Sequence, residues 1–172
     1  MTWRPEDFED LAGHLRRQIG SEFREEAEEV ERLTELQRRR KQTMSDVATK
    51  AMHAGDGATV AIGSRRWQGS IVGVGDDYLI LSTNRTVIEA PFLAITLRLE
   101  RSRSGGNIAK PLATTWVARL AELAMAEEHV TLVTEADELE GRIALVATDH
   151  IEFEGSVYVS IENVKAVLRS VD

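Results

Sequence analysis

The neighbouring carboxylates Asp76 and Asp77 come closest, of all residues in this chain, to a pair that could share acid and base roles in catalysis. Gly75 precedes them, and glycine followed by aspartate is typical of a tight turn. No base that could complete a catalytic set can be named from the sequence. We therefore interpret the pair as part of a turn between strands.

Metal and cofactor chemistry find equally little support in the residue pattern. The chain has no cysteine, so thiolate sites and disulfides are excluded. The four histidines are His14, His53, His129 and His150. No two of them have the helical spacing that is typical of a zinc site. Serine-nucleophile, phosphate-loop and dinucleotide signatures are also missing. We expect no metal, no cofactor and no enzymatic activity.

Two short segments of opposite charge are the strongest interaction candidates. Arg65, Arg66 and Trp67 occupy one predicted hairpin, and Asp137 and Glu138 occupy the positions that correspond to Arg65 and Arg66, 72 residues later. Opposite charges favour a contact between the two hairpins, either within one chain or head to tail between chains. They also fit two solvated hairpin tips, because exposed ion pairs contribute at most about 1 kcal/mol.

The basic hairpin permits an alternative interpretation as a nucleic-acid patch. The Trp67 ring would stack on a base, and positive charge would come from Arg65, Arg66, Arg101, Arg103 and Lys110. The net charge is −8, with +2 over residues 55–111 and −8 over residues 112–172. Phosphate binding needs a broad positive surface, so this interpretation ranks second to a protein contact.

The two hairpins correspond because the chain repeats itself. Shifting residues 128–172 back by 72 positions places Gly141 on Gly69 and Asp149 on Asp77. The apolar alternation of half-buried strands is kept as well. Five strands are predicted in the first copy, at 58–63, 66–75, 77–83, 86–90 and 94–100. Five are predicted in the second copy, at 129–134, 139–148, 150–154, 157–160 and 164–169.

Helical patterns precede both copies. Residues 43–54 align with residues 115–126 at the same shift, so each copy is expected to own a leading helix, and Pro111 suits the start of the second. Pro5 predicts the start of an earlier helix with a stripe of Phe8, Leu11, Leu15 and Ile19. Ser21 then predicts the start of a helix that runs to Ala54, where Gly55 ends it. Its apolar seam is broken at residues 38–41, which favours a pairing helix over a continuous coiled coil.

These elements predict an α+β chain with an N-terminal helical arm and two tandem five-stranded barrels, each preceded by a helix. The arm covers residues 1–42, the first helix and barrel 43–101, a linker 102–111, and the second helix and barrel 112–172. Barrels this small have thin cores. We expect them to pack on their helices, on one another or on a second chain.

The pattern resembles the Sm-like fold, a small SH3-like barrel. The resemblance depends on a leading helix, a glycine in the second strand and a motif at the second turn. In the first copy, the glycine and the motif are Gly69, Ile71, Val74, Gly75, Asp77, Tyr78, Leu79 and Leu81. The second copy keeps part of this pattern, as Gly141, Ile143, Val146, Asp149, Ile151 and Phe153. It implies assembly through edge strands, often into rings, and frequent RNA binding. This chain has Ile80 and Glu152 where that family has its RNA-binding asparagine, and its last turns, at 90–94 and 160–163, lack the Arg-Gly pair.

One functional hypothesis follows from the repeat, the charges and the resemblance. We expect a non-enzymatic assembly protein that uses tandem barrels and the arm to self-associate or to bind a protein partner. RNA or DNA binding by the basic patch of the first barrel is the alternative. No apolar run approaches the roughly 20 residues that span a bilayer, and the first residues lack the core of a signal peptide. A soluble cytoplasmic protein is therefore expected.

Overall fold

The computed structural model describes residues 23–24, 26–102, 105–106, 108 and 113–171. The chain divides into two units, residues 1–42 and residues 43–172. In the first unit, residues 23–24 and 26–40 are helical. The predicted helix that starts at Pro5, the predicted cap Ser21 and the predicted helix start Pro111 lie outside the described residues.

The prediction of a helix running without interruption to Ala54 is wrong. The first helix ends at residue 40, and a separate helix, α2 (Met44–Ala54), follows. Thr43 has extended backbone angles, and its side chain accepts a hydrogen bond from the Asp46 amide while the Asp46 carboxylate accepts one from the Thr43 amide. Such a capping box satisfies the amides of a new first turn, so it separates α2 from the preceding helix. Gly55, at φ 73°, ends α2 as predicted.

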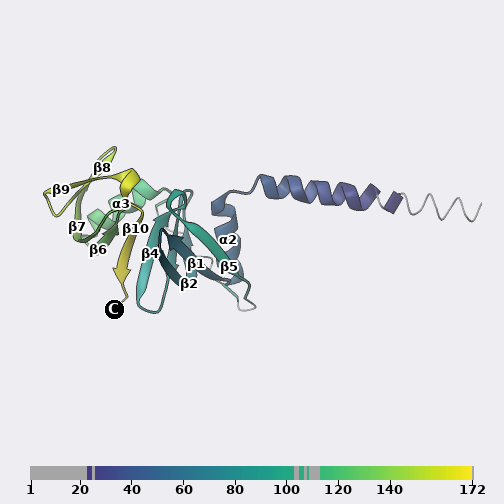
Figure 1. Cartoon of the computed structure of the whole chain (residues 1–172), viewed down its shortest axis with the longest axis horizontal. Coiled ribbons are helices and arrows are strands. Elements are labelled where there is room, and N and C mark those ends of the chain that lie inside the picture. The colour runs from purple at the N-terminus through teal and green to yellow at the C-terminus, as the bar shows by residue number, and fades with distance from the viewer. Residues whose placement is uncertain (1–22, 25, 103–104, 107, 109–112, 172) are drawn as a thin grey trace, which may run out of the picture. The chain divides into compact units, whose positions relative to one another are not determined.

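The second unit contains ten antiparallel strands in one sheet, with the order β5-β1-β2-β3-β4-β10-β6-β7-β8-β9 (Figure 1). The first five are β1 (Gly57–Ile62), β2 (Arg65–Val74), β3 (Tyr78–Ser82), β4 (Thr86–Pro91) and β5 (Thr96–Glu100). The second five are β6 (His129–Val133), β7 (Glu138–Val146), β8 (His150–Phe153), β9 (Val157–Ser160) and β10 (Ala166–Ser170). The α+β class is confirmed. The sheet is continuous and does not close, so two separate barrels are not observed.

The two halves of this sheet repeat each other. The strand order β5-β1-β2-β3-β4 recurs as β10-β6-β7-β8-β9, and α3 (Trp116–Met125) precedes the second set as α2 precedes the first. The register shift in β2 between Ile71 and Gly73 recurs in β7 between Ile143 and Leu145. Short 3₁₀ turns, η1 (Phe92–Ala94) and η2 (Ile161–Asn163), lead into β5 and β10. We call residues 43–101 the first repeat and residues 113–171 the second.

Each repeat has its own apolar core beneath its helix. The first core joins α2 to strands β1 to β4, and the second joins α3 to strands β6 to β10. The cores also exchange residues: Val133 and Ala166 of the second repeat pack in the first core, and Tyr78 of the first repeat packs in the second. Because burial of apolar side chains is the main stabilising term, neither repeat has a complete core without the other. No helix in the described ranges has the length and apolar character that crossing a membrane requires.

Replacing Gly69 by alanine is expected to destabilise the fold. A Cβ at Gly69 would collide with the backbone carbonyl of Ser82 on the neighbouring strand, and overpacking of this kind costs about 1–3 kcal/mol. The matched control is Gly57→Ala on β1, where a Cβ would meet ordinary contacts at 3.7 Å. Urea unfolding should show a lower midpoint for Gly69→Ala alone, and equal midpoints for both variants would contradict the close approach.

Candidate functional site at the junction between the repeats

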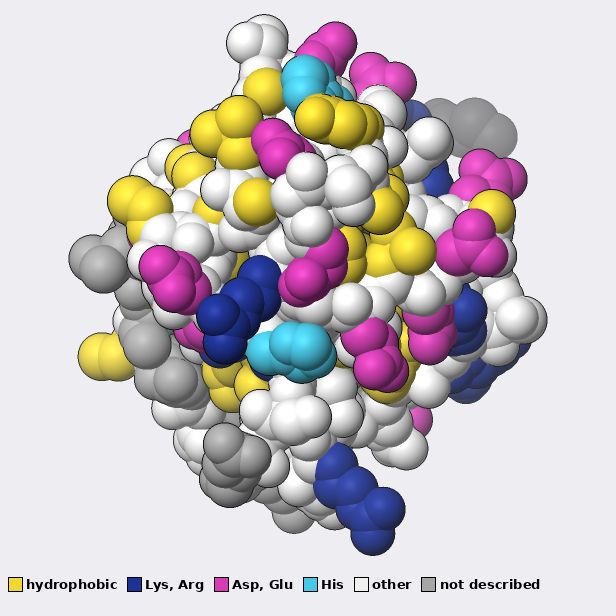
Figure 2. Space-filling model, turned by 90° about the vertical axis from the view of Figure 1, so that its left-hand side faces the viewer, with side chains coloured by type: hydrophobic (Ala, Val, Ile, Leu, Met, Phe, Trp, Pro, Cys, Tyr) yellow, Lys and Arg dark blue, Asp and Glu magenta, His cyan; other side chains and the backbone are white. Residues whose placement is uncertain are grey.

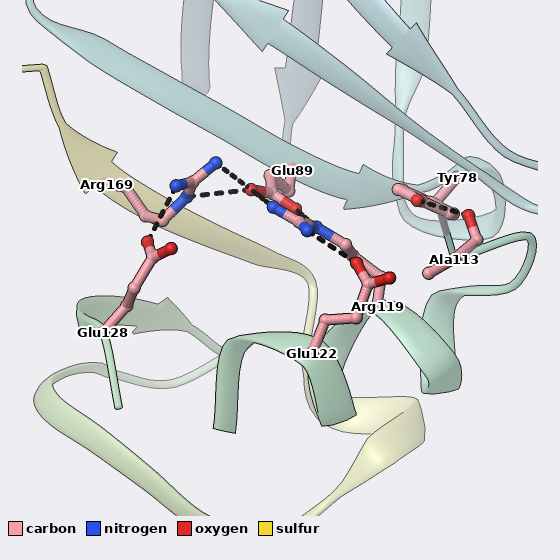
Figure 3. A network of polar contacts seen from close by, with 7 residues as sticks. All are labelled: Tyr78, Glu89, Ala113, Arg119, Glu122, Glu128 and Arg169. Carbon is pink, nitrogen blue, oxygen red and sulfur yellow. Dashed lines mark hydrogen bonds and ion pairs between the residues drawn. The ribbon is translucent and has the colours of Figure 1, made fainter. Parts of the chain in front are cut away.

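The two repeats meet where β4 pairs with β10, and one buried carboxylate lies at this junction. Glu89 of β4 is fully buried, and Val167 of β10 lies opposite it in the sheet. Arg119 of α3 donates to both Glu89 carboxylate oxygens, at 2.6 and 2.9 Å. Arg169 of β10 donates to Glu89 Oε1 through Nε, at 2.8 Å. A helix and a strand of the second repeat therefore both bind one acid of the first (Figure 3).

Two further acids complete this network. Arg119 Nη1 donates to Glu122 Oε2 and Arg169 Nη1 donates to Glu128 Oε2, each at 2.7 Å. The hydrogen bonds to Glu89 raise the pKa of the Arg119 guanidinium, which therefore stays charged. A buried ion is costly unless it is paired and hydrogen-bonded, and Glu89 has both kinds of partner. We call these five residues, Glu89, Arg119, Glu122, Glu128 and Arg169, the junction network.

The turn between β2 and β3 provides a second contact across the junction. Asp77 Oδ1 accepts a hydrogen bond from the first amide of α3, that of Trp116, at 2.6 Å. The Asp76 amide donates to Thr114 O at 2.7 Å, and the Tyr78 hydroxyl donates to Ala113 O at 2.9 Å. A carboxylate at a helix N-terminus is favourable because the amides there are unpaired and the dipole is positive. The carboxylate pair thus takes part in a turn, as the sequence indicates, and Asp77 also holds the neighbouring repeat.

The Tyr78 side chain is enclosed by this contact. It is fully buried, and its ring lies 5.9 Å from the Trp116 ring, measured between centroids. Burial raises the pKa of the Tyr78 phenol to about 12, since the charged form would lose its hydration. The neutral hydroxyl is therefore the form that the junction accommodates.

The charged hairpins of the sequence analysis also meet across the junction. Arg65 Nη2 lies 2.9 Å from Glu138 Oε1, and both side chains are about half exposed, at 40% and 45%. Arg66 is exposed, and Asp137 closes its own hairpin through backbone hydrogen bonds with Thr134. The structure thus brings Arg65 and Glu138 together within one chain. An ion pair this exposed adds less than about 1 kcal/mol.

The residues of the alternative nucleic-acid patch do not gather on one open surface in the described part of the chain. The Trp67 side chain packs against the first core, and Arg65 is engaged by Glu138. Arg66 and Arg101 are exposed, while Arg103 and Lys110 lie outside the described residues. The ring that would stack on a base is thus partly covered by its own repeat.

None of the described histidines is a member of the junction network, although His129 directly follows Glu128. His53 and His129 are exposed, and His150 Nδ1 lies 2.7 Å from Asp149 Oδ1. This contact lowers the pKa of the Asp149 carboxyl. His14 lies outside the described residues, and among those described no group of three or more histidine, aspartate or glutamate side chains is placed to hold a metal ion.

Two depressions flank η1 beside the junction. They measure about 450 and 410 Å³ and share Leu93, Ala94 and Lys165 in their walls. The larger one also contains Arg65 and Glu135. Its charged residues carry both signs, which does not favour a purely anionic ligand.

The positions equivalent to the junction contact are exposed at the β9 end of the sheet. Asp149, His150 and Tyr158 correspond to Asp77, Tyr78 and Glu89. Their side chains are 87%, 40% and 66% exposed, respectively. Figure 2 views the molecule from the side of β7, β8 and β9, and hydrophobic side chains gather on part of this face with acidic ones between them. The surface formed by Asp77, Tyr78 and Glu89 is therefore covered in the first repeat, whereas the equivalent surface of the second repeat is exposed.

Sequence reasoning missed the junction network. A signal was present, because Glu89 interrupts the apolar run Val87-Ile88-Glu89-Ala90, and the second copy has Tyr158 in its place. A charge within a strand that is otherwise apolar indicates either an exposed edge or a buried partner. Only the arrangement of β4, α3 and β10 decides between them.

Comparison with known proteins adds no family to this description. A scan of the chain against protein-family models finds no match, and a search of curated proteins finds none either.

Replacing Glu89 by glutamine is expected to lower the free energy of unfolding by about 3 kcal/mol. The change leaves two poorly solvated guanidinium groups without their shared counter-charge, and breaking a buried pair costs about 3–5 kcal/mol; Glu122 and Glu128 keep the loss at the lower end. The control is Glu138→Gln in the exposed pair with Arg65, for which less than about 1 kcal/mol is expected. Urea unfolding at neutral pH measures both variants, and equal losses would contradict the role of Glu89.

Deprotonation of the Tyr78 phenol is expected to lower the stability of the protein at high pH. Its pKa is raised to about 12 from an ordinary 10.0, so the neutral form contributes fully below pH 10 and this contribution is lost as the pH rises through 12. Tyr78→Phe should remove this part of the pH dependence. It should also cost about 1 kcal/mol at neutral pH, because the hydrogen bond to Ala113 is lost.

Urea midpoints at pH 7, 10, 11 and 12 would test the prediction for Tyr78. Tyr158→Phe is the control, since it removes the second tyrosine of the chain and leaves the junction intact. Parallel pH profiles for the native chain and Tyr78→Phe would show that another group causes the alkaline loss.

Proposed function

We propose that this protein is a non-enzymatic assembly protein in which each repeat is an Sm-like module and the outer strands join copies head to tail. One observation carries the proposal. β4 and β10 pair across the junction, whereas β9 and β5, which hold the equivalent positions in the other repeat, each have one neighbour within the described chain. Edge strands with open backbone groups pair readily with other edges. We assign a second copy of the chain as the partner, so that β9 of one copy pairs with β5 of the next.

The register of the internal junction can be transferred to this outer contact. Within the chain, Glu89 faces Val167 and Ile88 faces Leu168. Val167 pairs with Leu132 of β6 as Leu97 pairs with Val60 of β1. The equivalent residues therefore place Tyr158 opposite Leu97 and Val157 opposite Arg98 of the next copy. The Tyr158 ring, 66% exposed in the single chain, gains apolar cover from Leu97, and the aliphatic part of Arg98 covers Val157, which is 39% exposed.

The start of α2 supplies a second element of the same contact. Met44 corresponds to Trp116, and it is the first residue of its helix. The first amides of a helix lack partners within that helix. In the proposed contact, the Met44 amide of one copy donates to Asp149 of the next, as the Trp116 amide donates to Asp77. The Met44 side chain, which is 39% exposed, then covers His150.

The buried charge of Glu89 sets which edges combine. The residues that correspond to Arg119 and Arg169 in the first repeat are Val47 and Leu99. If β5 of another copy replaced β10, Glu89 would be buried beside two apolar side chains and without a cation, which is unfavourable. Specificity of this kind depends on penalties against wrong pairs. It directs β4 to its own β10 and β9 to β5 of another copy, and such a head-to-tail contact closes a ring or continues as a filament.

Replacing Tyr158 by lysine is expected to reduce self-association. The lysine would place a charge against the apolar Leu97 side chain of the next copy, and burying a charge without a partner is unfavourable. Tyr158→Phe keeps the aromatic ring and should leave assembly intact. Light scattering measures the mass, which for the unmodified chain should be a multiple of the 19.1 kDa monomer.

Leu145→Lys provides the matched control, because Leu145 is also an exposed apolar residue, at 53%, but lies on β7 and not on the outer edge. It should leave the mass unchanged. The proposal is wrong if the unmodified chain has the monomer mass at high concentration, or if Tyr158→Lys and Leu145→Lys behave alike.

A further inference from the structure

The helix of the first unit, residues 23–24 and 26–40, carries exposed apolar side chains along one side. We call it the arm helix. Its exposed apolar side chains include Phe23 at 67%, Val30 at 63% and Leu33 at 48%. At 100° per residue, these three lie within one third of the helix circumference. An exposed apolar stripe of this width is typical of a helix that packs against another helix.

The opposite side of the arm helix is occupied by ion pairs. Arg32 donates to Glu29 at 2.8 Å, Arg38 donates to Glu35 at 2.7 Å, and Arg39 donates to Glu35 at 3.0 Å. Arg32, Glu35 and Arg39 project away from the side that carries Val30, by the same helical geometry. Pairs at these spacings add only about 0.2–0.5 kcal/mol each in water, and most helical stability in proteins comes from packing of an apolar face. A partner on the apolar side would stabilise it.

The charges along the arm helix identify that partner as a second copy in the antiparallel direction. Residues 23–31 contain one basic and five acidic side chains, a sum of −4. Residues 32–41 contain five basic and one acidic, a sum of +4. Antiparallel copies place each negative half beside a positive half, whereas parallel copies place like charges together.

The seam positions lead to the same orientation. With a heptad spacing, Phe23, Val30 and Gln37 take one seam position, and Glu26, Leu33 and Arg40 take the other. Parallel helices stack equivalent residues, which would set Glu26 on Glu26 and Arg40 on Arg40. An antiparallel pair centred between residues 31 and 32 instead sets Val30 on Leu33, Glu26 on Gln37 and Phe23 on Arg40. We propose that the arm helix is a homodimerisation surface that pairs antiparallel with the arm helix of a second copy.

This contact is separate from the edge contact proposed above, and either can exist without the other. The test therefore uses the full chain with Tyr158→Lys, so that edge assembly is removed. In this background the protein should have twice the 19.1 kDa monomer mass. Val30→Glu together with Leu33→Glu should return it to the monomer mass while the urea midpoint of the second unit is unchanged. A monomer before these changes overturns the proposal.

Single cysteines determine the orientation, because the chain has none of its own. In the same Tyr158→Lys background, an equal mixture of Phe23→Cys and Arg40→Cys chains should form a mixed disulfide under mild oxidation. Phe23→Cys alone should form at least tenfold less dimer, since its two cysteines would lie about 25 Å apart in an antiparallel pair. Arg39→Cys mixed with Phe23→Cys is the control, because position 39 lies on the ion-paired side. Efficient self-crosslinking of Phe23→Cys would indicate a parallel pair and overturn the proposal.

Charge exchange gives an independent measurement. Changing Arg38, Arg39 and Arg40 to glutamate should weaken dimerisation at least tenfold, because two acidic halves then face the acidic halves of the partner. Mixing this variant with chains that carry Glu26→Lys, Glu28→Lys and Glu29→Lys should restore dimers of mixed composition. Loss without restoration in the mixture would contradict pairing of opposite halves.

Discussion

Burying a carboxylate away from water is costly unless cations pair with it, and the junction of this protein depends on that constraint. Glu89 lies in β4, but both of its cations, Arg119 and Arg169, belong to the other repeat. The carboxylate therefore has its counter-charges only when the repeats are joined in one arrangement. Apolar burial supplies most of the stabilisation, while the ion network selects which strands and which helix meet.

The repeat explains why the junction is informative about the rest of the surface. Two copies of one pattern present the same kinds of edge, so the contact that joins β4 to β10 has an equivalent in the outer strands β9 and β5. The backbone geometry is shared, as the matching register shifts in β2 and β7 indicate. The polar residues are not shared, because Tyr158 replaces Glu89 and Val47 replaces Arg119. Duplication therefore preserves the backbone geometry of the strand edges, and divergence of a few side chains distinguishes the outer edges from the inner contact.

The arm helix and the sheet edges differ in which groups are available to select a partner. A strand edge carries unpaired backbone groups that any other edge can satisfy, so side chains must restrict the choice. A helix satisfies its own backbone, and only its side chains can select a partner and a direction. The opposite charges of its two halves provide such a direction. The edge contact and the arm contact that we propose would link copies in two independent ways, and the strength of the combined assembly would depend on whether both contacts form at once.

Local pattern was enough to determine the strands of the described sheet. Alternating apolar residues predicted the strands to within two residues at nearly every boundary, and the shift of 72 predicted the repeated turn and the repeated leading helix. The helix break at Thr43 was missed because a capping box with Asp46 outweighs the helical pattern on either side. What the tertiary structure alone decided is how the repeats combine. Ile88 and Val157 hold equivalent positions, yet one is fully buried and the other 39% exposed. That difference arises from β10 pairing with β4, a contact between residues about 80 positions apart, and no periodicity within either copy contains it.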